Sequence, residues 1–262
     1  MVIDYYSDLI KIRNSKPLVH HITNYVVMNV SANITLALGA SPVMAHAKPE
    51  VEDMVSIANV LYINIGTLSD HWIEAMLSAG KMANKKHIPV LLDPVGAGAT
   101  KYRTETAKRI LEEIKIDILK GNAGEMQSLA GEDVKVKGVD AVTSAGLETA
   151  QSLAKKYELT AVVTGQKDYV SNGKQSAIIK NGTDMFSRIT GAGCMLGSVI
   201  ASFMAVNNDP FISAIEGLVS FEIAGEKAAA RTKLPGSFMV ALMDEIYSLN
   251  QEAYKLADVE IK

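Results

Sequence analysis

The chain has 262 residues, of which 48% are hydrophobic and 21% are charged, and its formal net charge at pH 7 is −3. These values are typical of a globular protein with a sizeable core, and they give no electrostatic reason to expect a nucleic acid or an acidic membrane as a partner. The single cysteine, Cys194, excludes an intrachain disulfide and fits a reducing compartment, so we expect a cytoplasmic protein.

The sequence shows no sign of a membrane segment or a signal peptide. Its longest strongly apolar run, residues 194–206, is shorter than the ~20 residues that a membrane span needs. Charged residues are frequent among the first thirteen positions, where a signal peptide would place an apolar segment. We therefore expect no contact with a membrane.

Short apolar runs alternate with helical patterns along most of the chain. Strands are predicted at residues 17–22, 42–45, 61–65, 89–92, 117–119 and 160–163. Helices are predicted at residues 25–38, 49–59, 69–85, 104–113, 124–130 and 141–156, with Ser69 as N-cap of the third. Apolar strands that are each followed by a helix indicate a mostly parallel sheet covered on both faces.

The pattern changes after residue 165. Residues 168–180 place Asn172 and Gly173 between strand-like flanks, which predicts a hairpin at an antiparallel edge of the sheet. Three helices are predicted at residues 194–206, 210–231 and 237–256. We expect an α/β fold in which the whole chain, residues 1–262, forms one domain without a separate lid domain.

Ligands of an open α/β sheet bind beyond the carboxyl ends of its strands, so the residues that follow each strand are the candidates for chemistry. The most specific are Gly191, Ala192, Gly193 and Cys194, which lead into an apolar helix. The glycines let backbone N–H groups approach a ligand, and the helix N-terminus adds a positive dipole. This segment predicts an anion hole for a phosphoryl group, and the alternative is a glycine-rich turn into a core helix.

Two other nucleotide-binding patterns are excluded for this segment. No stretch of the chain has the Gly-Lys-Ser/Thr of a Walker A motif. Gly191, Gly193 and Gly197 do not fit G-x-G-x-x-G, because the last gap is one residue too long.

Cys194 is the candidate catalytic residue. A helix N-terminus lowers the pKa of a thiol, and the thiolate would then serve as general base for an attacking hydroxyl. The alternative is a small buried hydrophobic residue, which is the more common role of a free cysteine.

Asp93 and Glu125 are the candidate metal ligands, because each lies at or just after the end of a predicted strand. Mg²⁺ keeps several waters and needs only one or two carboxylates together with substrate phosphates. The alternatives are a turn aspartate before Pro94 and an ordinary cap, since Asn122 and Glu125 have the spacing of a capping box.

Three further residues are candidate ATP contacts: Lys120, Asn122 and Thr164. Lys120 would meet a phosphate as a point charge, and the alternative is a solvated lysine. The adjacent histidines, His20 and His21, would point to opposite faces of a strand and so do not predict a metal site.

Five segments together resemble the hydroxyethylthiazole kinase family of the ribokinase-like superfamily. They are residues 20–24, residues 93–96, Gly121 and Asn122 with Glu125, residues 163–165 and residues 191–194. The resemblance runs over nearly the whole chain. It implies a ribokinase-like fold without a lid domain, and a homotrimer whose active sites are shared between neighbouring subunits.

The resemblance also implies the reaction and the roles of residues. ATP and Mg²⁺ would convert 4-methyl-5-(2-hydroxyethyl)thiazole into its phosphate, in thiamine biosynthesis or salvage. Matching positions imply that Asn24, Met44 and Gly191 contact the thiazole, that Lys120 and Thr164 contact ATP, that Asp93 and Glu125 order Mg²⁺, and that Cys194 faces the substrate hydroxyl.

This chain has lysine at position 120, where the family often has arginine, so the two-pronged contact of a guanidinium group is lost. Four alternatives stay open. A relative with the same fold would be a hydroxymethylpyrimidine or pyridoxal kinase, or an ATP- or ADP-dependent dehydratase of hydrated nicotinamide nucleotides. A nucleotide-binding sensor would bind without turnover, and a hydrolase would use Cys194 as nucleophile.

Overall fold

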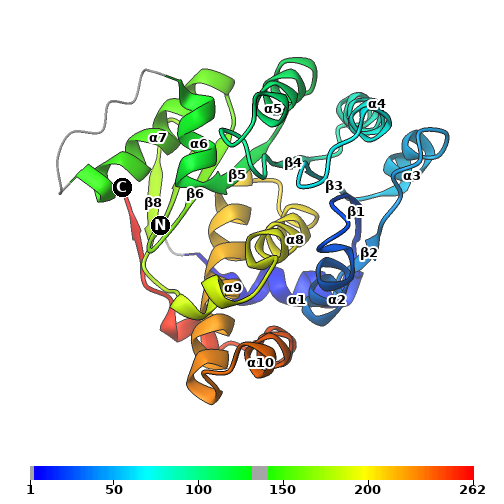
Figure 1. The fold of residues 1–262 in the computed structure, drawn as a ribbon. Coiled ribbons are helices and arrows are strands. Elements are labelled where there is room, and N and C mark those ends of the chain that lie inside the picture. Colours follow the sequence, from blue (N-terminus) through cyan, green and yellow to red (C-terminus); the bar gives the residue numbers. More distant parts are fainter. Residues whose placement is uncertain (1–2, 132–140) are drawn as a thin grey trace.

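In the computed structural model, which describes residues 3–131 and 141–262, one sheet of nine strands crosses the molecule in the order β2-β1-β3-β4-β5-β6-β7-β8-β9 (Figure 1). The strands are β1 (Leu18–Ile22), β2 (Ser41–Val43), β3 (Val60–Asn64), β4 (Val90–Asp93), β5 (Ile118–Asn122), β6 (Thr160–Thr164), β7 (Asp168–Ser171), β8 (Ser176–Ile179) and β9 (Val259–Ile261). Strands β1 to β6 pair in parallel, and β7, β8 and β9 each join antiparallel.

Helices cover both faces of this sheet (Figure 1). One face carries α1 (Tyr5–Ser15), α2 (Met28–Leu38), α8 (Ala192–Met204), α9 (Pro210–Arg231) and α10 (Pro235–Tyr247). The other carries α3 (Val51–Ile57), α4 (Asp70–Lys86), α5 (Lys101–Glu113), α6 (Ala123–Ala130) and α7 (Ala141–Tyr157). Two short 3-10 helices are η1 (Asp184–Arg188) and η2 (Ala253–Leu256). No helix in the described part of the chain is long and apolar enough to cross a bilayer.

The two apolar cores follow from the alternation of side chains along each strand. In β3, Val60 and Tyr62 belong to the core under α8 and α9, whereas Leu61 and Ile63 belong to the core under α3 and α4. A strand buried on both faces needs apolar residues at every position. This is why the strands read as continuous apolar runs in the sequence.

The predicted parallel sheet and its antiparallel hairpin are confirmed, and the differences lie at the ends of elements. The helix predicted at residues 25–38 starts only at Met28, because the Asn24 Oδ1 atom accepts the N–H of Val26 at 3.1 Å in a turn. Ser69 precedes α4, but its side chain makes no capping hydrogen bond. Helix α1, the short helix η1 and strand β9 were not predicted from the sequence.

The last predicted helix, residues 237–256, was too long. Helix α10 ends at Tyr247, and the chain continues through a turn into η2. Arg13 of α1 closes that end, donating to the carbonyl oxygens of Tyr247 at 2.7 Å and Leu249 at 3.0 Å. This contact joins residues far apart in sequence, so local propensity gave no indication of it.

Helices α8 and α9 approach each other closely, and this contact holds α8 behind the site described below. A Cβ placed on Gly217 of α9 would lie 2.7 Å from the Cα of Ile200 of α8, which is closer than real side-chain contacts. The backbone of α8 cannot move away without disturbing the sheet on its other side. Gly217 therefore sets the distance between the two helices.

We expect Gly217→Ala to lower the free energy of unfolding by about 1–3 kcal/mol through overpacking, measured by urea denaturation. Gly236→Ala in α10 is the matched control, because a Cβ there meets no atom within 4 Å. The control should leave stability unchanged or raise it by up to ~1 kcal/mol. Equal effects of the two substitutions would contradict this role of Gly217.

Candidate active site

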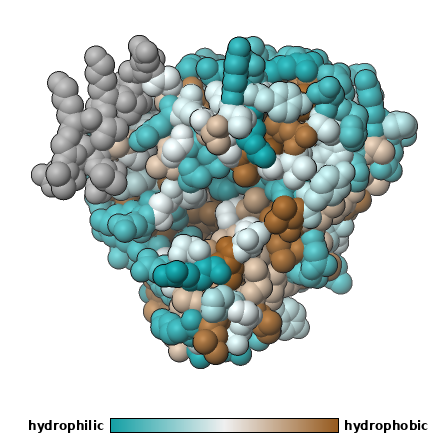
Figure 2. Space-filling model, viewed as in Figure 1, coloured by the Kyte–Doolittle hydropathy of each residue, from teal (hydrophilic) through white to brown (hydrophobic). Residues whose placement is uncertain are grey.

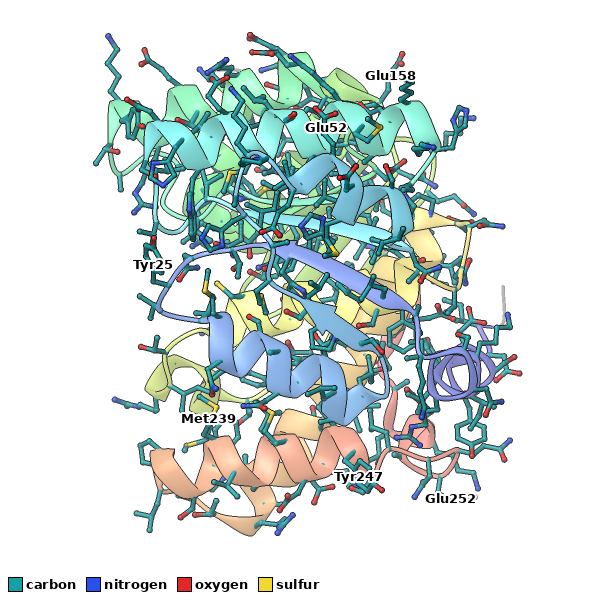
Figure 3. The ribbon with its side chains drawn as sticks, turned by 90° about the vertical axis from the view of Figure 1, so that its right-hand side faces the viewer. Tyr25, Glu52, Glu158, Met239, Tyr247 and Glu252 are labelled. Atoms are coloured by element: carbon teal, nitrogen blue, oxygen red, sulfur yellow. The ribbon has the colours of Figure 1, made fainter. Side chains whose placement is uncertain are left out.

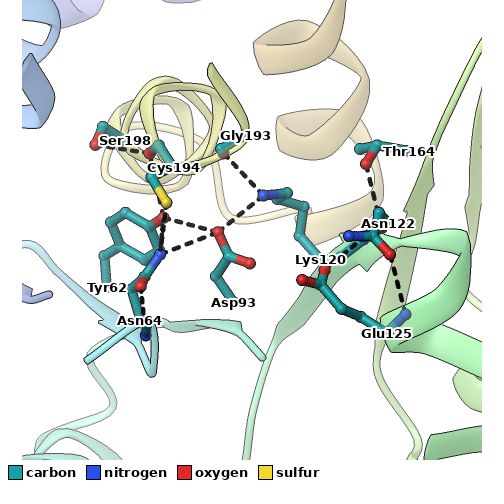
Figure 4. Close-up of polar contacts among 12 residues, drawn as sticks. Tyr62, Asn64, Asp93, Lys120, Asn122, Glu125, Thr164, Gly193, Cys194 and Ser198 are labelled. Atoms are coloured by element: carbon teal, nitrogen blue, oxygen red, sulfur yellow. Dashed lines mark hydrogen bonds and ion pairs between the residues drawn. The ribbon is translucent and has the colours of Figure 1, made fainter. Parts of the chain in front are cut away.

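The parallel strands end at one edge of the sheet, and polar side chains collect there (Figure 4). Asn64 is the last residue of β3, Asp93 of β4, Asn122 of β5 and Thr164 of β6. Asn24 lies two residues beyond β1. Strands with apolar interiors thus present a row of amide, carboxylate and hydroxyl groups at their carboxyl ends.

Lys120 and Asp93 form a buried ion pair at the centre of this row. The Lys120 Nζ atom lies 2.8 Å from Asp93 Oδ2 and donates to the carbonyl oxygen of Gly193 at 2.8 Å. Lys120 is only 3% exposed, so the alternative of a solvated lysine is wrong. Burial acts to lower the pKa of Lys120, but the negative charge of Asp93, its hydrogen bond to Lys120 and the charge of Glu125 outweigh burial and raise that pKa.

Asp93 Oδ2 is also the meeting point of two further side chains. It accepts the hydroxyl of Tyr62 at 3.0 Å and the amide of Asn64 at 3.2 Å. Asn64 in turn donates to the Cys194 Sγ atom at 3.2 Å, and its Oδ1 accepts from Asn24 at 2.8 Å. One polar network therefore joins the ion pair to the cysteine.

Cys194 is buried in this network, with Asn24 Nδ2 at 3.7 Å from its Sγ atom. The expectation of a lowered thiol pKa is wrong. Burial, and then the negative charge of Asp93, raise the pKa of Cys194 to about 11, although Lys120, Asn64 and Asn24 act in the opposite direction. Desolvation outweighs the helix N-terminus, so the thiol is neutral at physiological pH.

Helix α8 begins where the sequence analysis placed the anion hole. Gly191 is its N-cap with φ +84°, a left-handed conformation that favours glycine, and a Cβ there would meet Val27 at 2.7 Å. Ala192, Gly193 and Cys194 form the first turn, whose N–H groups have no acceptor within the helix. These amides provide the geometry that an anion hole requires.

Glu125 and Asn122 form a capping box at the start of α6. Asn122 Oδ1 accepts the N–H of Glu125 at 3.0 Å, and Glu125 Oε2 accepts the N–H of Asn122 at 2.8 Å. The other carboxylate oxygen of Glu125 accepts the N–H of Gly96 at 2.8 Å, which fixes the loop after β4. The capping alternative is thus correct for the local geometry, and it holds the carboxylate beside the strand ends.

A divalent cation that keeps its waters is compatible with these carboxylates. Each oxygen of Glu125 already accepts a backbone N–H, and Asp93 Oδ2 is paired with Lys120. The described residues contain no group of three or more His, Cys, Asp or Glu side chains that would hold a metal directly. Asp93 and Glu125 nevertheless feel each other's charge, since Asp93 adds to the effect of burial in raising the pKa of Glu125. Mg²⁺ that keeps its waters fits such a pair.

A cavity of roughly 980 Å³ opens beside this network. Four of the predicted site residues line it: Asn122, Thr164, Ala192 and Gly193. Its other walls include η1, α9, the turn after β6, Asp168 of β7 and the turn after β8. Figure 2 shows the molecule from this side, with polar and apolar side chains mixed around a hollow near its centre. The cavity is large enough for a nucleotide.

The remaining candidates lie on the other side of Cys194. Met44 follows β2, which pairs in parallel with β1, so it lies at the same edge of the sheet as Asn24 and is partly buried. His20 and His21 do not converge: His20 Nε2 contacts the carbonyl oxygen of Ala45, and His21 contacts the Val19 carbonyl. Burial lowers the pKa of His21 to about 4, so its ring is neutral.

Three residues of this site were not predicted from the sequence. Tyr62 and Asn64 lie inside an apolar run and read as core, although a polar residue at the end of such a run was a signal for Asn64. Arg103 of α5 gave no signal. It donates to the carbonyl oxygens of Ile65 at 3.0 Å, Gly66 at 2.8 Å and Val95 at 2.7 Å, and so joins the loops that follow β3 and β4.

Comparison with known proteins agrees with this architecture. A hydroxyethylthiazole kinase from Caldivirga maquilingensis is 56% identical over 255 residues, which cover 97% of this chain and 96% of that protein. The solved structure of the hydroxyethylthiazole kinase protein from Pyrococcus horikoshii superposes with a TM-score of 0.93 at 42% identity and covers 98% of both chains.

The fold alone extends to more distant proteins. A ribokinase-like superfamily protein from Enterococcus faecalis superposes with a TM-score of 0.64 at 14% identity, over 87% of this chain and 86% of that one. This confirms the expected ribokinase-like α/β fold. The family model described as the hydroxyethylthiazole kinase family matches residues 9–252. The chain therefore belongs to the hydroxyethylthiazole kinase family, a family of small-molecule kinases.

Proposed function

We propose that this protein transfers the γ-phosphoryl group of ATP to the hydroxyl of 4-methyl-5-(2-hydroxyethyl)thiazole, in thiamine biosynthesis or salvage. The observation that carries the proposal is the position of the first turn of α8. On one side Ala192 and Gly193 line the cavity, and on the other Cys194 joins Asn24 and Asn64. A phosphoryl donor and an alcohol acceptor would meet across this turn.

The proposed mechanism depends on positioning and charge neutralisation, which phosphoryl transfer needs more than covalent chemistry. ATP would lie in the cavity against Asn122 and Thr164, with its γ-phosphate at the amides of Gly191 to Cys194. Lys120, held by Asp93 and by the Gly193 carbonyl, would supply positive charge beside the first turn of α8. Asn24, Met44 and Gly191 would line the acceptor side.

We propose Mg²⁺ as the metal, held through water by Asp93 and Glu125. When bound, it would neutralise phosphate charge. Both carboxylates are fixed by the protein before any metal arrives, Glu125 by two backbone N–H groups and Asp93 by Lys120. The alcohol would then meet an electrophile whose orientation is set by the sheet edge and by α8.

We further propose a homotrimer of single-domain subunits in the cytoplasm, with active sites at the subunit interfaces. The surface beside the acceptor side supports an interface there. Tyr25 and Val26, next to Asn24, are 63% and 67% exposed although both are apolar. Figure 3 shows Tyr25 at the edge of the molecule, and its ring packs on Trp72 with centroids 4.8 Å apart. Exposed apolar groups beside a site are typical of a surface that another subunit covers.

The first measurement is the release of ADP from ATP, with and without Mg²⁺ and the hydroxyethyl thiazole. We expect thiazole-dependent ADP that requires Mg²⁺, and the phosphorylated thiazole in the mass spectrum. Hydroxymethylpyrimidine, pyridoxal and hydrated nicotinamide nucleotides are the comparison substrates. Preferential turnover of any of these would replace the proposed acceptor, and nucleotide binding without turnover of any would favour a sensor.

The buried ion pair gives a prediction with separate effects on stability and activity. Lys120→Met leaves the Asp93 carboxylate buried without its cation, so we expect a loss of about 3–5 kcal/mol in the free energy of unfolding. It should also lower kcat by roughly 100-fold or more. Adding Asp93→Asn in the same chain should recover part of the stability but none of the activity. Urea denaturation and the ADP assay provide the two readouts.

The control for that prediction is the exposed pair of Lys81 and Glu113, whose side chains are 56% and 31% exposed. Lys81→Met should cost less than about 1 kcal/mol and leave turnover unchanged. If Lys120→Met were no more destabilising than Lys81→Met, the pair would not hold the site together.

Cys194 gives a prediction for the pH dependence. Its pKa of about 11 lies above the unperturbed value, so the thiol stays protonated through neutral pH. A thiolate base would make kcat/KM for the thiazole rise about tenfold per pH unit below that pKa. We expect no such rise, and we expect Cys194→Ser to slow turnover by about tenfold or less with little change in KM for ATP. A unit slope that disappears in Cys194→Ser would show instead that the thiolate accepts the proton.

A further inference from the structure

Glu222 of α9 is a buried carboxyl group on the wall of the nucleotide cavity, and the proposed mechanism does not use it. It is 7% exposed, and no hydrogen bond or ion pair joins it to any other residue in the described parts of the chain. Its Oε2 atom lies under the turn after β8, where a Cβ on Gly182 would come within 3.1 Å of it. The N–H of Gly182 is not available, because it donates to Glu226. A largely buried carboxyl group that opens on the cavity, with no partner among the described residues, is available to a ligand there.

The charges around Glu222 favour its neutral form. Asp168 of β7 lies on the same wall and is 3% exposed, with Oδ1 accepting the N–H of Gly165 at 3.1 Å. Burial, followed by the charges of Asp168 and Glu226, raises the pKa of Glu222 well above its ordinary value. The ammonium group of Lys180, on the same wall, lies within 4 Å of the carboxylates of Asp258 and Glu260 instead.

Two more charged residues, Asp184 and Arg188 of η1, stand at the exposed rim of the cavity. A neutral carboxyl group also suits a cavity that receives a polyphosphate, because an ionised pair would repel it. Glu222 therefore offers one donor, its O–H, beside one acceptor, its C=O.

Two parts of the cavity wall differ in chemistry. One part is the first turn of α8, with Ala192 and Gly193, which suits phosphate. Another part of the wall is aromatic: Phe186 stacks on Phe221, with centroids 4.8 Å apart, and Glu222 follows Phe221 directly. Aromatic side chains on part of a cavity wall suit contact with a planar base.

We propose that Glu222 recognises the adenine base of ATP, with its O–H donating to N1 and its C=O accepting from the 6-amino group. The inference rests on the proposed use of ATP. The purine edge presents an acceptor and a donor side by side, which a neutral carboxyl group matches in a pair of parallel hydrogen bonds. Glutamine has the same donor and acceptor pattern, whereas methionine has a similar size and neither group.

The test combines changes on both partners. The dissociation constants of ATP and of purine riboside 5′-triphosphate, which lacks the 6-amino group, are measured by calorimetry for the wild type, Glu222→Met and Glu222→Gln. We expect the wild type to prefer ATP by about tenfold and Glu222→Gln to keep that preference. Glu222→Met should lose the preference by weakening ATP more than purine riboside triphosphate, because the analogue also loses the hydrogen bond to N1 but has no 6-amino group to lose. The wild-type comparison needs no variant, so the proposal is testable even if Glu222→Met does not fold.

Glu216→Gln is the matched control. Glu216 is also a buried carboxyl group of α9, with a pKa raised to about 9 by burial and Asp8, but it lies outside the cavity. It should leave both dissociation constants unchanged. Equal binding of the two nucleotides by the wild type, or an equal loss for both in Glu222→Met, would overturn the proposal.

Two other occupants of the site are separated in the same experiment. If ATP binding by the wild type depends on K⁺ and this dependence disappears in Glu222→Gln, the carboxyl group binds a cation. If the wild type binds ATP more tightly than 2′-deoxy-ATP and Glu222→Met removes that difference, the carboxyl group binds the ribose. Either result would overturn base recognition. Thiazole-dependent ADP release by the wild type is measured separately, so a failure of the proposed reaction is distinct from a failure at Glu222.

Discussion

The ammonium group of Lys120 is the interaction on which the site depends. It lies between the carboxylate of Asp93 at the end of β4 and the carbonyl oxygen of Gly193 in the first turn of α8. A single buried cation therefore joins two neighbouring strands to the helix whose N-terminus is the proposed anion hole. An isolated charge in this position would cost several kcal/mol, and the pairing with Asp93 makes its burial tolerable. The positive charge is thus fixed in place before any phosphate arrives, which is the condition for electrostatic preorganisation.

The same low-dielectric environment determines the state of Cys194. Without water, the thiol keeps its proton even at a helix N-terminus, because the nearest negative charge, Asp93, adds to the cost of ionisation. The amides of Asn24 and Asn64 orient the sulfur without ionising it. Cys194 is therefore suited to positioning the acceptor alcohol and not to acting as a strong base. Positioning without a strong base suits a reaction whose transition state is dominated by breaking the bond to the leaving group.

The loops that bear these groups are held by contacts from outside the row of strand ends. Arg103 joins the loop after β3 to the loop after β4. Glu125 accepts the N–H of Gly96 and so fixes the loop after β4 as well. Behind them, the close approach of α9 through Gly217 fixes α8. Short loops tied by buried or half-buried hydrogen bonds lose little conformational entropy on binding. These hydrogen bonds explain how a site formed mainly by strand ends is ordered.

The sequence alone determined the parallel sheet, its antiparallel hairpin and the edge at which polar side chains gather. Apolar runs set the strands and glycine-rich turns mark their ends, and both signals are local. It also identified Asn24, Asp93, Lys120, Asn122, Glu125, Thr164 and Cys194, all of which lie at that edge. The tertiary structure decided the state of these groups. It showed that Lys120 is part of a buried ion pair and not a solvated lysine, and that Cys194 is a neutral thiol and not a thiolate. It also added Tyr62, Arg103 and Glu222, and it ended α10 at Tyr247 through a contact with Arg13. Burial and the charge of distant neighbours set protonation and pairing, and neither can be read from spacing along the chain.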